Sequence, residues 1–157
     1  MKIKVFKIAR IVLVLLILST LAYAFYQSSL PTKESVQESN KVGEIIEEVI
    51  PQETKPGEYI QKNLRKLAHI AEFFGLGLWT SLYVVFFSRK KGIIAAVIPF
   101  GMISALLDET VQIFSKRGAS VKDVWIDMLG YTAAVAVVAI VFFTVFFLKR
   151  STTQKRV

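Results

Sequence analysis

The chain has 157 residues, of which 54% are hydrophobic, and its mean hydropathy is +0.51. This composition excludes a typical soluble domain of this size, and the long apolar blocks indicate an integral membrane protein. The formal net charge is +8, and the absence of cysteine excludes a disulfide or a thiolate metal site. We expect one compact helical domain over residues 1–157.

The amino-terminal region is basic over residues 1–10 and then apolar as far as Tyr26. It predicts a first membrane-spanning helix over about residues 5–26, close to the ~20 residues that one bilayer core requires. A cleaved signal peptide is the alternative, because Ala22-Tyr23-Ala24 has the small-x-small pattern of a cleavage site. In either case the residues that follow lie outside the cell.

The polar stretch over residues 27–57 is predicted to be an external loop that contains three prolines. Within it, apolar residues recur at helical spacing from Val42 to Ile50, and glutamates occupy the opposite face. This pattern predicts a short amphipathic helix that Pro51 ends. We expect the helix to cover the bundle or to lie in the membrane interface.

Three further apolar segments predict the remaining spans, at about residues 67–87, 92–114 and 123–148. The helix that contains the second span should begin near Gly57, and Pro99 with Gly101 permits a kink in the third. The sequence therefore predicts an all-α integral membrane protein that folds as a four-transmembrane-helix bundle.

The orientation of the bundle follows from its basic residues. One set of flanks carries no acidic residue and eleven basic ones, namely Lys2, Lys4, Lys7, Arg10, Arg89, Lys90, Lys91, Lys149, Arg150, Lys155 and Arg156. Every aspartate and glutamate lies toward the other side. The positive-inside rule then places both termini in the cytoplasm of a multi-pass protein of the cell membrane.

Ionisable residues interrupt the start of the second apolar segment. Lys66, His69 and Glu72 are spaced three apart, and His69 is the only histidine in the chain. On a helix this spacing places all three on one side. Because an ionisable group inside an apolar span is costly, it marks function or a specific buried partner.

Depth along the helices brings further polar residues to the same level. Depth is counted from the basic residues at the predicted cytoplasmic side, at about 1.5 Å of rise per residue. Glu72 lies roughly 26 Å from Arg89, and Asp108 lies roughly 26 Å from Lys91. Asp127 lies roughly 33 Å from Lys149. Since the hydrocarbon core is about 30 Å thick, all three lie near its outer boundary. We predict an outward-facing binding cluster composed of Lys66, His69, Glu72, Asp108, Glu109, Gln112, Arg117, Asp123 and Asp127.

Several members of this cluster also have a structural interpretation. Lys66 could extend to the headgroups, and Glu109 could face water near the end of its helix. Ser120-x-x-Asp123 resembles a capping box, so Asp123 could cap a helix. Arg117 could hold a phosphate headgroup or form a salt bridge within its loop.

The most deeply placed members are harder to assign to a surface role. His69, Glu72, Asp108 and Asp127 could bind a ligand, transfer protons or take part in catalysis. The alternative is that they form a buried ion-pair network that joins the helices. His69, Glu72 and Asp108 are the catalytic candidates, as general acid and base. One histidine without cysteine would suit Mg²⁺ or Ca²⁺ better than Zn²⁺, and we predict no metal site and no cofactor.

Two stretches together resemble the VanZ-like family of bacterial membrane proteins. Residues 65–73 are similar to its Lys-x-x-His-x-x-Glu pattern, which Lys66, His69 and Glu72 match. Residues 108–130 are similar to its Asp-Glu-x-x-Gln pattern and to the Arg, Asp and Asp/Asn-x-x-Gly positions that follow. Residues 25–31 are similar to the family's exit from its first helix, so the resemblance covers most of the chain.

The resemblance implies a protein of the cytoplasmic membrane of a Gram-positive bacterium. The name-giving member is associated with teicoplanin resistance through lower binding of the drug at the cell surface. For this chain it implies antibiotic resistance at the cell envelope as a role, but it specifies no molecular activity and no oligomeric state.

Three functions are compatible with these observations, and we favour the first. A non-enzymatic protein would bind a lipid headgroup, a lipid-linked wall precursor or a glycopeptide with the outward cluster. An intramembrane enzyme would act on such a lipid through His69 with Glu72 or Asp108. A proton-coupled sensor or transporter is less favoured, because the inner half of the spans carries no polar path. Nucleic acid is not expected as a partner, since the basic residues lie at membrane boundaries.

Overall fold

The computed structural model describes residues 2–51, 53–88, 91–116, 118 and 120–154, and most of these residues are helical, with no strand among them. The all-α prediction is therefore confirmed. The helices are α1 (Lys2–Ser29), α2 (Thr32–Glu47), α3 (Lys55–Phe87), α4 (Lys91–Ala95), α5 (Val97–Phe114) and α6 (Val121–Gln154).

Four helical stretches are long and apolar enough to cross a membrane. They are Lys4–Ser29, Lys55–Phe87, Lys91–Phe114 and Val121–Arg150. Most of the apolar side chains on these stretches are exposed rather than packed inside the protein. Such exposure is costly in water and suits helices that are surrounded by lipid.

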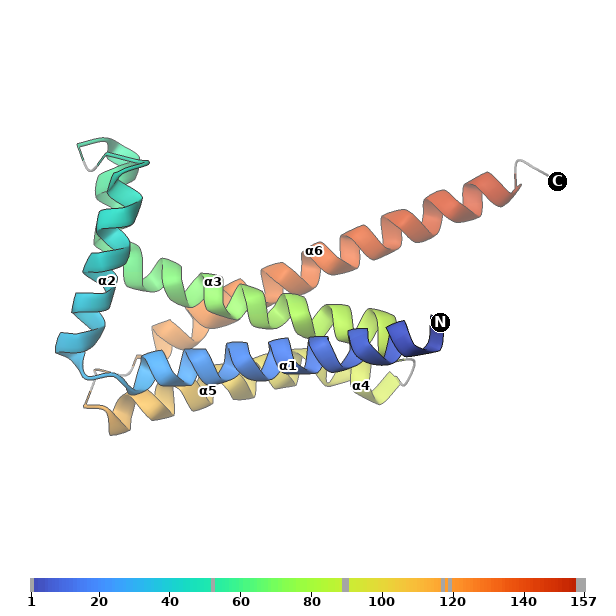
Figure 1. Cartoon of the computed structure of the whole chain (residues 1–157), viewed down its shortest axis with the longest axis horizontal. Coiled ribbons are helices and arrows are strands. Elements are labelled where there is room, and N and C mark those ends of the chain that lie inside the picture. The colour runs from blue at the N-terminus through green and yellow to red at the C-terminus, as the bar shows by residue number, and fades with distance from the viewer. Residues whose placement is uncertain (1, 52, 89–90, 117, 119, 155–157) are drawn as a thin grey trace.

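The spanning helices pack side by side through contacts of α1 with α3 and α5, and of α6 with α3 and α5 (Figure 1). The start of α1 and the end of α6 lie at the same end of the molecule, opposite α2 (Figure 1). This arrangement fits an even number of spans. The cytoplasmic location of that end stays a prediction from the basic residues.

The polar stretch between the first two spans is more helical than its sequence indicated. Here α2 begins at Thr32, ten residues before Val42, and ends at Glu47, before the predicted stop at Pro51. It stands beside the first part of α3, away from the other helices (Figure 1). The two helices pack at Gly43, whose carbonyl accepts a hydrogen bond of 2.9 Å from Gln61 Nε2.

The third span is divided at Ala96 into the short α4 and the longer α5. Pro99 explains the interruption, because proline has no amide hydrogen for the carbonyl of Ala95, four residues earlier. The break lies beside the core, where the Tyr131 hydroxyl donates a 2.8 Å hydrogen bond to the Val97 carbonyl. A residue of α6 thus fixes the start of α5.

The closest approach in the bundle is between α3 and α6. A Cβ at Gly130 would collide with the backbone carbonyl of Ile70, and a Cβ at Gly77 would collide with that of Tyr131. Glycine at both positions lets the two backbones touch, as small residues do between membrane helices. The core that surrounds this contact includes Phe73 and the fully buried Tyr131.

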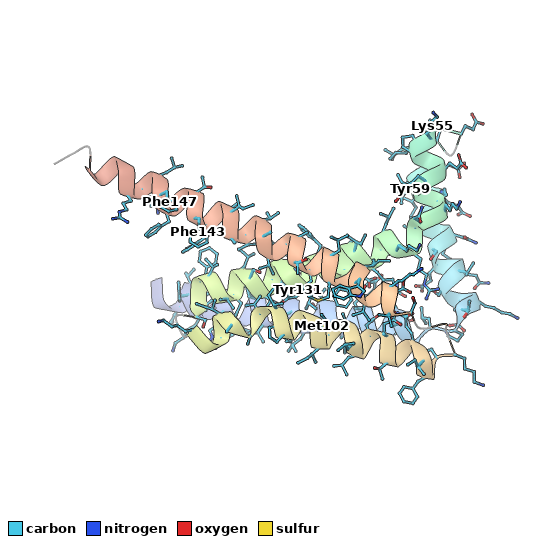
Figure 2. The ribbon with its side chains drawn as sticks, turned by 180° about the vertical axis from the view of Figure 1, so that it is seen from behind. Lys55, Tyr59, Met102, Tyr131, Phe143 and Phe147 are labelled. Carbon is cyan, nitrogen blue, oxygen red and sulfur yellow. The ribbon has the colours of Figure 1, made fainter. Side chains whose placement is uncertain are left out.

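The second half of α6 extends beyond the other helices. Phe143 and Phe147 lie on this free part, far from Tyr131 in the packed part (Figure 2). All the side chains from Val141 to Arg150 are exposed. This half therefore presents an apolar surface that the rest of the protein does not cover.

Replacing Gly130 with alanine tests the contact between α3 and α6. We expect Gly130→Ala to lower the free energy of unfolding by about 1–3 kcal/mol, because the new methyl group overpacks against the Ile70 backbone. Thermal unfolding of the detergent-solubilised protein measures the effect. The control is Gly92→Ala, since a Cβ at Gly92 meets nothing within 4 Å. Equal stability of the two variants would contradict the proposed tight contact.

Candidate functional site

Three ionisable side chains from three helices meet inside the protein. His69 of α3 points its Nδ1 at two carboxylates, 3.2 Å from Asp127 Oδ1 of α6 and 3.8 Å from Asp108 Oδ2 of α5. One ligand atom from each of the three lies within 4.8 Å of the others. Both aspartates are 0% exposed and the His69 side chain is 12% exposed, so the group lies in a largely dry environment.

Neutral polar side chains orient one of the two carboxylates. Asp108 Oδ2 accepts hydrogen bonds of 2.8 Å from Ser28 Oγ on α1 and 3.0 Å from Gln112 Nε2 on α5. Gln112 Oε1 in turn accepts a 3.3 Å hydrogen bond from the Arg65 guanidinium. All four spanning segments thus contribute to one polar cluster, which we call the histidine–aspartate cluster (Ser28, Arg65, His69, Asp108, Gln112 and Asp127).

Several atoms of the cluster are buried without a hydrogen bond from any described residue. They are His69 Nδ1, Asp108 Oδ1, Asp127 Oδ1 and Asp127 Oδ2. His69 Nδ1 lies within ion-pair distance of Asp127 Oδ1, at 3.2 Å. Because a buried carboxylate without partners is costly, these atoms mark the place where a further group would be most stabilising.

Glu109, which follows Asp108 in the sequence, has a more structural role. Glu109 Oε2 accepts a 2.8 Å hydrogen bond from the backbone N–H of Ser120 at the start of α6. The Ser120 hydroxyl accepts from the N–H of Lys122, so the first turn of α6 is capped from both sides. Glu109 is only 6% exposed, and its other oxygen lacks a hydrogen-bond partner within the described part of the chain.

A pocket of about 670 Å³ opens beside the cluster, between α1, α2 and α3. Its size is typical of a small-molecule site. Its lining includes the apolar side chains of Val42, Ile46, Ile50, Ile60 and Leu64. It also includes charged and polar side chains, among them Gln27, Glu38, Lys41, Arg65, His69 and Glu72.

A smaller cavity of about 170 Å³ lies on the other side of α3, toward α6. Its polar lining residues are Lys62, Asn63, Arg65, Lys66, His69 and Asp123. Arg65 and His69 line both cavities. These two side chains therefore lie between the two cavities. Both also belong to the polar cluster that contains the buried aspartates.

Comparison with known proteins gives one match. A sequence model of the VanZ/LLP1 family matches residues 11–154, nearly the whole chain. The chain belongs to the VanZ/LLP1 family. Searches of curated proteins and of solved structures gave no match.

The structure divides the nine predicted binding residues of this VanZ/LLP1 protein among several places. The buried cluster contains His69, Asp108, Gln112 and Asp127. Glu72 lines the larger pocket, Lys66 and Asp123 line the smaller one, and Glu109 caps α6. Arg117 lies outside the described residues.

Two cluster residues were not among the predicted ones. Arg65 directly precedes the predicted Lys66, but Arg65 is half-buried and reaches Gln112, whereas Lys66 is exposed. Ser28 lies at the end of α1 and is 1% exposed. A neutral hydroxyl at a membrane boundary is inexpensive to place, so it gave no signal in the sequence.

A variant of Gln112 tests the internal order of the cluster. We expect Gln112→Leu to lower the free energy of unfolding by about 1–3 kcal/mol, because Arg65 loses its acceptor and Asp108 loses a donor. Thr110→Val is the control, since Thr110 is exposed on the same helix and bonds only the carbonyl of Leu106. Its effect should stay below about 0.5 kcal/mol. Two equal melting temperatures would contradict a structural role for Gln112.

Proposed function

We propose that this VanZ/LLP1 protein binds a phosphate-bearing amphiphile at the outer face of the cytoplasmic membrane. The supporting observation is the mixed lining of the larger pocket, which combines apolar side chains such as Val42 and Leu64 with charged ones at Arg65, His69 and Glu72. A headgroup would lie against the charged side chains, and the start of its lipid chain would lie against the apolar ones.

Arg65 is the side chain best suited to hold the phosphate. Its planar guanidinium offers paired donors that match a phosphate, and its contact with Gln112 uses only one of its terminal nitrogens. Lys41 of α2 adds a second positive charge to the same pocket. The carboxylates of Glu38 and Glu72 would accept hydrogen bonds from sugar or amine groups of the ligand.

Two sources of such a headgroup fit this chemistry, a membrane phospholipid and a lipid-linked wall precursor. The second would connect the pocket with the teicoplanin resistance that the family resemblance implies. A protein that holds the precursor at the outer leaflet reduces the number of sites at which a glycopeptide binds the cell surface.

An intramembrane enzyme is the second candidate function. The observation that favours it is the contact of His69 with Asp127 and Asp108 at the wall of the larger pocket. A histidine whose one nitrogen faces a carboxylate can transfer protons through the other. The first candidate requires only binding, whereas the second requires turnover of the bound lipid.

Binding of labelled lipids by the purified protein tests the proposed function. The two probes are fluorescent phosphatidylglycerol and a fluorescent polyprenyl-diphosphate sugar, and we expect the wild type to bind one or the other. Arg65→Ala should bind the same probe at least about tenfold more weakly, because a hydrogen bond to a charged group is worth about 1.5–3 kcal/mol. Arg150→Ala and Glu47→Gln change exposed charges outside the pocket and should leave binding unchanged. The two probes distinguish the two sources of the headgroup.

Binding that is unaffected by Arg65→Ala and by Glu72→Gln would refute the pocket as the lipid site. Chromatography of the same mixtures shows whether either probe is converted. Conversion that His69→Gln abolishes would support the enzyme, and binding without conversion would support the binding protein.

The orientation of the pocket toward the outside can be tested independently. The natural chain has no cysteine, so single cysteines can be introduced without background labelling. We expect a membrane-impermeant maleimide to label Glu53→Cys in intact cells and to label Gly92→Cys only after permeabilisation. Both positions are exposed, and they lie before α3 and within α4. The reverse labelling pattern would place the pocket in the cytoplasm.

A further inference from the structure

We infer that His69, Asp108 and Asp127 form a binding site for one divalent metal ion, with Zn²⁺ as the preferred ion. This site lies in the histidine–aspartate cluster beside the larger pocket, and of its three residues His69 also lines that pocket. It stands on its own side chains and does not depend on the binding of a lipid. It also revises our expectation from the sequence, which was that no metal site exists.

The first argument is the charge of the buried group. Within the described part of the chain, His69 is the only basic side chain that forms an ion pair with Asp108 or Asp127. If both aspartates are ionised, two carboxylates and even a charged imidazole leave one negative charge uncompensated in a site where both aspartates are 0% exposed. A neutral imidazole, two carboxylates and a divalent cation sum to zero, which removes the cost of that burial.

The second argument is that the free atoms point toward one another. Both oxygens of Asp127, one oxygen of Asp108 and Nδ1 of His69 have no hydrogen-bond partner among the described residues. One ligand atom of each residue lies within 4.8 Å of the other two. A histidine nitrogen and two carboxylates that converge in this way are the kinds of atom that bind a transition-metal ion.

The spacing of these atoms agrees with a small ion. Two ligand atoms that each lie about 2.1 Å from a tetrahedral zinc ion are about 3.4 Å apart. The observed separations of His69 Nδ1 are 3.2 Å from Asp127 Oδ1 and 3.8 Å from Asp108 Oδ2, the oxygen that also accepts from Ser28 and Gln112.

The types of ligand decide which ion is preferred. Carboxylates alone would suit Mg²⁺ or Ca²⁺, but an imidazole nitrogen suits a transition metal. Zn²⁺ binds nitrogen and oxygen ligands more tightly than Mn²⁺ does, and three protein ligands leave a fourth position open. Ser28 and Gln112 hold Asp108 by its Oδ2 and thereby supply the supporting hydrogen bonds that metal sites require.

Metal titration of the full-length protein in detergent tests the site. After removal of metals with a chelator, ZnCl₂, MnCl₂, MgCl₂ and CaCl₂ are each titrated by calorimetry, and bound metal is counted by mass spectrometry. We expect one Zn²⁺ per chain, weaker Mn²⁺ and no resolvable Mg²⁺ or Ca²⁺. Zn²⁺ should also raise the melting temperature of the wild type.

Matched variants locate the ion. Asp127→Asn should abolish zinc binding and the zinc-dependent rise in melting temperature, whereas Asp123→Asn, on the same helix but in the smaller cavity, should retain both. Ser28→Ala should weaken zinc binding about 10- to 100-fold by releasing Asp108, and it serves as the test if Asp127→Asn does not fold.

Either of two results would overturn the inference, namely a wild type that binds none of the four ions or equal zinc binding by wild type and Ser28→Ala. Glu72→Gln separates this inference from the proposed function, because it alters the lipid pocket and should leave zinc binding unchanged. Zinc binding without lipid binding would refute the proposed function alone.

Discussion

The backbone contact between α3 and α6 is the constraint on which the rest of the site depends. Gly77 and Gly130 remove the two side chains that would hold these helices apart. His69 directly precedes Ile70, which Gly130 touches, and Asp127 lies one turn before Gly130. The same contact that joins the two helices therefore brings the imidazole to the carboxylate. In lipid, no hydrophobic force drives helices together. Close packing and the polar contacts that it permits therefore stabilise the association of the helices.

The histidine–aspartate cluster in turn determines which helices can be neighbours. Each spanning segment contributes at least one member, from Ser28 of α1 to Asp127 of α6. A polar group facing lipid costs several kcal/mol, so an arrangement that separated these helices would be unfavourable by about that amount for each exposed group. Beyond the cluster, the side chains from Val141 to Arg150 are all exposed. This part of α6, which includes Phe143 and Phe147, diverges from the bundle (Figure 2).

The sequence predicted the helices and the meeting of His69 with Asp108 and Asp127, because long apolar runs and buried charges both carry a large energetic signal. Depth along a helix does not show the direction in which a side chain points. Arg65 and Lys66 lie at almost the same depth, but neighbouring residues on a helix point about 100° apart, and only Arg65 reaches Gln112. The early start of α2 at Thr32 was missed for a related reason. Val36 is the only apolar residue in its first ten positions, so no apolar period marks them.

His69 connects the two parts of the candidate site. Its Nδ1 faces the buried aspartates, while the ring lines both the larger pocket and the smaller cavity. A change in the charge of the cluster therefore changes the electrostatic potential at the pocket wall, because interactions in a low-dielectric environment are only weakly screened. A negative cluster would oppose a phosphate group held by Arg65, and a cluster neutralised by a cation would not. The cost of burying two aspartates beside one imidazole thus bears on ligand binding as well as on folding.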